Sequence, residues 1–166
     1  MPRATVRAAI TSYLSSQNIA LLSTVMPHPP KFTVDGTIFQ GVTPGTGTGA
    51  VIYIHLAEQD EHRIELRGNA PGGKARPYVV SLICVMHSKK RTTQEAGADN
   101  DTFLDSLVAA IEANKNAGQP GVVFLWGEGS DLYGTDIKVT AEMPRPMKLG
   151  VSQVYSRVDV IALEII

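Results

Sequence analysis

The sequence predicts an α+β fold, in which an antiparallel or mixed β-sheet is packed by two main helices and carries long hairpin loops. Segments with helical and strand-like spacing follow one another in the order helix, several strands, helix, several strands. Most of the strands stand in hairpin relation to the next, which argues against a repeated βαβ fold. No internal repeat or linker divides the chain, so residues 1–166 are expected to form a single domain.

Apolar residues recur at helical spacing near the N-terminus and predict a short amphipathic helix from about Thr5 to Ser16. A brief apolar stretch, Ile19 to Val25, follows this helix. The segment from Met26 to Gly49 is then rich in Pro, Gly and Thr. A loop of this length inside a compact domain is usually functional or ordered by a partner. The apolar stripe of the helix consists of Val6, Ala9, Ile10, Tyr13 and Leu14.

Three strand-like segments come next. Ala50 to Leu56 is largely apolar, Arg63 to Leu66 alternates apolar and charged residues, and Tyr78 to His87 is apolar on both alternating faces. The last pattern predicts a central strand of the sheet. Residues 67–76, RGNAPGGKAR, have the composition of an extended hairpin tip.

A second helix is predicted to begin at a capping box in its acidic form, Thr102 to Asp105, and to end at Gly118 before Pro120. Its stripe consists of Phe103, Leu104, Leu107, Val108 and Ile111. The predicted strands after this helix are Val122–Trp126, Asp136–Glu142 and Ser152–Ile166, the last two joined across MPRPMKLG.

Composition limits the classes of function. The chain has 15 Lys and Arg against 16 Asp and Glu, a net charge of −1, so it lacks the basic excess of a nucleic-acid-binding surface. Its single cysteine, Cys84, lies in an apolar run and is expected to be a buried thiol of a reduced protein. MPRATVRAAITSYL has no unbroken apolar stretch like that of a signal peptide, and no apolar run approaches a membrane span. A soluble, intracellular protein without a membrane partner is expected.

The glycine-rich stretch GTGTGAVIYIH, residues 45–55, raises the question of a phosphate-binding loop. Such a loop follows a strand and opens a helix, whereas these glycines precede a strand. No Gly-Lys-Ser or Gly-Lys-Thr is present in the stretch. The glycines are therefore expected to let the loop bend or pack close to another backbone, and no cofactor is predicted.

The histidines give only a weak prediction of a metal site. His55 and His62 have no tight ligand spacing, and solvated histidines at a hairpin end are the favoured interpretation. Cys84 and His87 are three residues apart on a predicted strand and would point to opposite faces. The carboxylates of Glu128, Asp131 and Asp136 do not have the spacing of a calcium loop. No catalytic or metal-binding residue is predicted, and the protein is not expected to be an enzyme.

Two basic clusters remain. Arg67, Lys74 and Arg76 flank the predicted hairpin tip, and Lys89, Lys90 and Arg91 follow the predicted central strand. Positive charge on such loops is usually solvated. It would also suit docking onto an acidic protein face or weak contact with DNA phosphates.

Over nearly its whole length the sequence resembles the tail-terminator proteins of long, non-contractile-tailed bacteriophages, in the form found in phages of actinobacteria. The resemblance lies in element order and small-residue patterns, and TVDGTIFQGVTPGTGTG and MPRPMKLG depart from the family pattern. The resembling segments are PRATVRAAITSYL, MPHPPKF, GTGAVIYIHLAEQDEHRIELRG, GGKARPYVVSLICVMHS, ADNDTFLDSLVAAIEA and VDVIALEII.

This resemblance implies a structural protein of the virion without enzymatic activity, with a sheet flanked by helices. Six copies would close into a ring at the head-proximal end of the tail, after assembly in the host cytoplasm. The ring would stop growth of the tail tube protein and present a face to the head–tail connector or stopper, with genomic DNA passing nearby in the lumen.

Candidate contacts follow from this implied role. Phe32, Ile38 and Phe39 in the long loop are candidates for contact with the neighbouring subunit. Arg67, Lys74 and Arg76 are candidates for contact with the tube or the lumen. Two alternatives stay open: a head-completion or neck adaptor protein, and, less favoured, a small metal-dependent hydrolase using His55 and His62.

Overall fold

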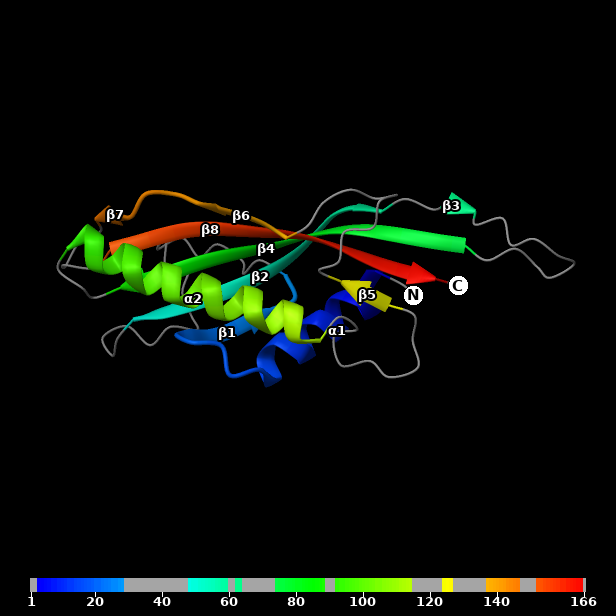
Figure 1. Cartoon of the computed structure of the whole chain (residues 1–166), viewed down its shortest axis with the longest axis horizontal. Helices are drawn as coiled ribbons and strands as arrows, with labels where there is room; N and C mark the ends of the chain where they lie inside the picture. Colours follow the sequence, from blue (N-terminus) through cyan, green and yellow to red (C-terminus); the bar gives the residue numbers. More distant parts are fainter. Residues whose placement is uncertain are drawn as a thin grey trace, which may run out of the picture.

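The computed structural model confirms the α+β fold (Figure 1). It describes residues 3–28, 48–59, 62–63, 74–88, 92–114, 124–126, 137–146 and 152–165. Within these ranges, two helices lie on one face of a mixed β-sheet. We call the other side of the sheet the second face.

The first helix buries the stripe expected of it, and the second buries its predicted stripe except for Val108, which is half-buried. Helix α1 spans Arg3–Ser16, and its buried residues are Val6, Ala9, Ile10, Tyr13 and Leu14, as predicted. Helix α2 spans Thr93–Ala113 and buries Phe103, Leu104, Leu107 and Ile111 against the same core. The Tyr13 hydroxyl donates a hydrogen bond to the Ala110 carbonyl at 2.6 Å, which ties the two helices together.

The sheet has the strand order β1-β2-β4-β8-β5. Strand β4 lies between β2 and β8, so the predicted central position of this segment is confirmed. Strand β1 runs parallel to β2 and the other pairs are antiparallel, which makes the sheet mixed. The bounds are β1 Leu22–Met26, β2 Gly49–Gln59, β3 His62–Arg63, β4 Lys74–Ser88, β5 Phe124–Trp126, β6 Lys138–Ala141, β7 Arg145–Pro146 and β8 Ser152–Ile165.

Strand β8 is paired along both of its edges. One edge pairs with β4 over its full length. The other edge pairs in succession with the short strands β7, β6 and β5. These short strands therefore form one lateral limit of the described sheet, and β1 forms the opposite limit.

The predicted hairpin tip, residues 67–76, extends three residues too far, because β4 begins at Lys74. Lys74 and Arg76 both belong to this strand, which pairs with β3 and the end of β8. The pairing of β4 with β8 includes Pro77. A proline is tolerated here because the pairing of β4 with β2 ends at Tyr78 and does not include Pro77. Residues 64–73 lie outside the described ranges.

The predicted start of the second helix is also wrong. The N-cap is Thr92, whose hydroxyl accepts a hydrogen bond from the Glu95 backbone N–H, and the Glu95 side chain accepts one in return from the Thr92 backbone. Thr102 lies inside the helix, where its hydroxyl donates to the Ala98 carbonyl. The helix ends at Ala113 with Asn114 as C-cap, several residues before Gly118.

Gly49 supports the expected role of the glycines before β2. A Cβ at this position would overlap the Ser23 hydroxyl of β1. The neighbouring Ala50 N–H donates to the Leu21 carbonyl at 2.8 Å, which fixes β1 close to β2. Gly49 therefore permits close packing of two strands, while residues 45–47 lie outside the described ranges.

Candidate interaction surfaces

The structure places few of the predicted contact residues. Phe32, Ile38, Phe39 and Arg67 lie outside the described residues, as do Lys89, Lys90 and Arg91. Lys74 and Arg76 lie two residues apart in β4, and the Arg76 side chain is half-buried. The assignments of these residues to a subunit, tube or lumen contact therefore stay predictions.

A row of polar residues crosses the second face of the sheet. His55 pairs with Ser81, and Ser81 pairs with Asp159. The Ser81 hydroxyl donates to Asp159 Oδ1 at 2.6 Å, and Arg157 Nε donates to the same oxygen at 2.6 Å. This row contains a serine, a histidine and a carboxylate, the side chains of many hydrolases.

The geometry of the row does not match that of a nucleophilic site. In a triad the histidine lies between the hydroxyl and the carboxylate. Here the serine lies between them and is 1% exposed, so a substrate has no access to its oxygen. The row instead joins β4 to β8 by charge-assisted hydrogen bonds.

Cys84 and His87 lie on opposite faces of β4, as predicted. The Cys84 thiol is buried in the core and donates to the Leu82 carbonyl, and burial raises its pKa. His87 is half-buried on the second face, with its Nε2 3.1 Å from Gln153 Nε2. Within the described residues, no group of three or more His, Cys, Asp or Glu could hold a metal ion. His62 begins β3, but its side chain lies outside the description.

Strand β6 is exposed along its whole length. Lys138 to Met143 are all exposed, with Val139 at 44% and Met143 at 84%. The sequence KVTAEM nevertheless alternates polar and apolar residues, the pattern of a strand with one buried face. The apolar side chains of β6 therefore have no cover among the residues that the structure describes.

The outward edge of β6 also carries backbone groups that do not bond to β8. The Glu142 N–H donates to the Tyr155 carbonyl at 2.8 Å, and Thr140 lies opposite Arg157. Because hydrogen-bonded and non-hydrogen-bonded pairs alternate in an antiparallel ladder, the N–H and C=O of Val139 and Ala141 point away from β8. These groups can receive another strand.

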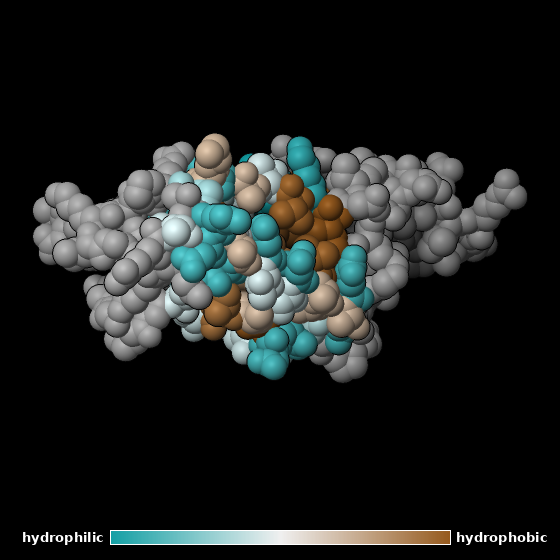
Figure 2. Space-filling model, turned by 60° about the vertical axis from the view of Figure 1, so that its left-hand side comes forward, coloured by the Kyte–Doolittle hydropathy of each residue, from teal (hydrophilic) through white to brown (hydrophobic). Residues whose placement is uncertain are grey.

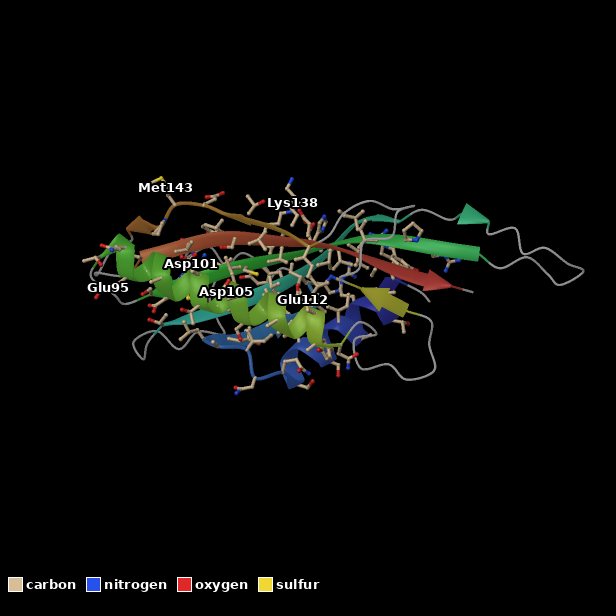
Figure 3. All side chains as sticks on the ribbon, viewed as in Figure 1. Glu95, Asp101, Asp105, Glu112, Lys138 and Met143 are labelled. Carbon is tan, nitrogen blue, oxygen red and sulfur yellow. The ribbon has the colours of Figure 1, made fainter. Side chains whose placement is uncertain are left out.

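Helix α2 is acidic, and its N-terminal part borders this edge. The helix contains five carboxylates and no Lys, Arg or His. Figure 3 shows Asp101, Asp105 and Glu112 following one another along the helix, with Lys138 and Met143 on the side of β6. A Cβ on Gly97 would lie 3.9 Å from Pro144 Cγ, so this flank of α2 faces the segment after β6. None of the three carboxylates forms an ion pair with a described residue.

Hydrophobic side chains do not form a broad surface at this end of the molecule. In a view that brings the N-terminal end of α2 forward, hydrophilic residues dominate and hydrophobic ones form small patches between them (Figure 2). No helix in the described ranges is long and apolar enough to cross a membrane.

Sequence reasoning identified β6 only as a strand. Its alternation was visible, but its exposure on both faces depends on where the ladder with β8 places it, which no local pattern reveals. No protein-family model matches the chain, and no curated protein matches it in sequence. Function is therefore inferred from the chain's own residues and from the resemblance given above.

Proposed function

We propose that this chain is a structural virion protein that forms a ring on the end of a phage tail tube. The ring ends polymerisation of the tube and provides the face to which the head connector or stopper joins. In this assembly, Phe32, Ile38 and Phe39 contact the neighbouring subunit, and Arg67, Lys74 and Arg76 contact the tube or line the lumen.

The exposed strand β6 carries this proposal. Monomeric proteins usually protect an edge strand with charges, proline or a covering element. Strand β6 has one charge, Lys138, yet it exposes Val139 and Ala141 beside backbone groups that do not bond to β8, and Met143 just after the strand is also exposed. Such a strand suits a protein whose last packing step is assembly with another chain. The α+β fold, with both helices on one face of the sheet, agrees with the fold that the resemblance implies.

A closed ring places a definite demand on the subunit. One surface of each copy must meet a different surface of the next. The rotation from copy to copy must also bring the last copy back into contact with the first. The described sheet ends in two different strands, β6 with its neighbours on one side and β1 on the other. The subunit therefore has two unlike limits, as a heterologous interface requires.

Electron microscopy of infected-cell lysates depleted of this chain tests the proposed function. Tails of uncontrolled length beside full, tailless heads are the expected result, and re-supply of the chain should restore normal virions. Tails of normal length that fail to join heads would instead assign the protein to the neck. Complete virions in depleted cells would contradict any role in assembly.

A further inference from the structure

We infer that strand β6 of one copy pairs with strand β1 of the next copy, so that the sheet continues from subunit to subunit. This inference rests on the ring proposed above and identifies the surfaces that hold it together. The chemical partner of the exposed β6 edge is thus a second copy of this chain.

Strands β6 and β1 lie at opposite edges of the sheet and at the same level along the strand direction. Two rows of directly paired residues connect them without a break. The first row consists of Thr140, Arg157, Ile83, Tyr53 and Met26, and the second of Ala141, Ser156, Cys84, Ile52 and Val25. Two copies placed side by side in one orientation therefore bring β6 and β1 together without a shift along the strands.

The strand directions also agree. Strand β1 is parallel to β2, and three antiparallel pairings follow, from β2 to β4, from β4 to β8 and from β8 to β6. Strand β6 therefore runs opposite to β1. Neighbouring copies in a ring whose axis lies along the strands share one orientation, so the new pair is antiparallel, the more stable arrangement per residue.

The side chains of the two strands point to matching faces. Thr140 lies opposite Arg157 on the second face, where Met26 packs against the cluster of Val51, Tyr53 and Val85. Ala141 lies opposite Ser156 on the helix side, where Val25 belongs to the core. The pleat of β6 therefore continues into β1 with no side chain on the wrong face.

Strand β1 is an edge that can accept such a partner. Its sequence, LSTVM, contains no charge and no proline, the two common protections of an edge strand. It borders an open hollow of about 270 Å³, lined by Ser15, Gln17, Asn18 and Ile19 together with the first residues of the strand. The hollow leaves room for side chains of a neighbouring strand.

Charge favours this pairing between copies. Helix α1 contacts β1 and β2, and α2 contacts β4 and β8, on the same side of the sheet. Joining β6 to β1 therefore brings the N-terminal part of α2, which faces the segment after β6, towards α1 of the next copy, while its C-terminal part packs on α1 of its own copy. Helix α2 carries five carboxylates and no cation, whereas α1 carries Arg3 and Arg7 and no carboxylate. Complementary charge on the two helices fixes the order of subunits.

A disulfide test uses Thr140→Cys with Met26→Cys in the full chain. Within one copy these positions are separated by four strand spacings, roughly 19 Å, too far for a disulfide, which needs Cα atoms within about 7 Å. Covalent links can therefore form only between copies. The control, Thr140→Cys with His55→Cys, places the second thiol on β2, whose two edges are already paired. The native Cys84 is buried and stays in both variants.

After oxidation of the concentrated chain, alone or on isolated tail tubes, we expect a series of disulfide-linked oligomers of increasing size. The control variant should give at least tenfold less of these linked oligomers. Rings that form without links between the paired cysteines would overturn the inference and leave the proposed ring in place. A chain that stays monomeric in both conditions would overturn the ring and the inference together.

Ala141→Pro provides a second test. It removes the outward N–H of β6 and leaves the N–H groups that bond to β8, so the monomer should keep its thermal stability within a few degrees while assembly is lost. Thr140→Ala, which alters only a side chain of the same strand, should assemble normally. Assembly of the proline variant at the concentration of the unaltered chain would contradict the pairing of β6 with β1.

Discussion

At the scale of single residues, two buried tyrosines form a natural comparison. Tyr13 is 6% exposed and its hydroxyl donates to the Ala110 carbonyl, whereas Tyr53 is 5% exposed and its hydroxyl lacks a hydrogen-bond partner among the described residues. An unsatisfied buried hydroxyl costs about 1–3 kcal/mol, and a satisfied one contributes about 1 kcal/mol. Tyr53→Phe should therefore stabilise the fold by about 1 kcal/mol, and Tyr13→Phe should destabilise it by about as much. Urea denaturation measures both, and equal losses would contradict this assignment.

The burial of His87 makes stability depend on pH on the acid side of neutrality. Burial lowers its pKa below the ordinary value of 6.5, because the charged ring loses solvation. The unfolded chain therefore binds this proton first as pH falls, so stability is fully present above pH 6.5 and is lost as pH falls through the folded-state pKa. His87→Gln should flatten the stability profile as pH falls below 6.5. Denaturation at several pH values measures the free energy of unfolding of both proteins. If it falls with pH as steeply in the variant as in the unaltered chain, other groups cause the loss of stability.

At the scale of elements, the start of α2 separates two candidate capping boxes. Thr92 caps the helix with Glu95, whereas Thr102 lies in its interior. Thr92→Ala should cost about 1 kcal/mol because it leaves an N-terminal N–H without its acceptor. Thr102→Ala, the matched control, should change stability by less than about 0.5 kcal/mol. A larger loss in the control, measured by thermal denaturation, would favour the start at Thr102.

The elements show where sequence patterns suffice. The stripe of α1 and the doubly apolar run of β4 each identify one element and its burial, since these depend on local spacing. The start of α2 was misplaced because both threonines fit a capping pattern, and only the burial of Ala96 and Asn100 extends the packed face towards the N-terminus. The buried Asn100 side chain also contacts the Ser156 hydroxyl at 3.1 Å, a tertiary bond that no helical spacing predicts.

At the scale of the whole molecule, the candidate surfaces depend on topology more than on motifs. The rows that connect Ala141 to Val25 involve four strand pairings between distant parts of the chain. Six of the strands lie near predicted segments, whereas β1 and β7 were not predicted as strands. The parallel pairing of β1 with β2 and the position of β6 beside β8 are long-range choices. The sequence alone therefore does not reveal that these segments become exposed edges of the sheet, although it contains the residues that form them.

The acidic face of α2 gives a prediction in which folding and assembly respond in opposite directions. Asp101 and Asp105 are one helical turn apart and repel each other, which destabilises a helix by about 0.2–0.5 kcal/mol. Asp105→Lys replaces this repulsion with an attractive pair, so the monomer should gain a few tenths of a kcal/mol or more. The same change places a positive charge towards Arg3 and Arg7 of the next copy, which disfavours assembly. The protein concentration at half-assembly should therefore rise by at least two- to fivefold, equivalent to about 0.4–1 kcal/mol.

Arg3→Glu in the Asp105→Lys background restores opposite charges across the interface and should recover part of the lost assembly. Denaturation of dilute protein reports the monomer, and mass measurement against concentration reports the ring, so the two effects are separated in one set of variants. The loss should also shrink at high salt, since exposed charges are screened over about 10 Å at 0.1 M ionic strength. Assembly that is indifferent to charge at residue 105, or a swap that recovers nothing, would remove the α2 face from the contact between copies.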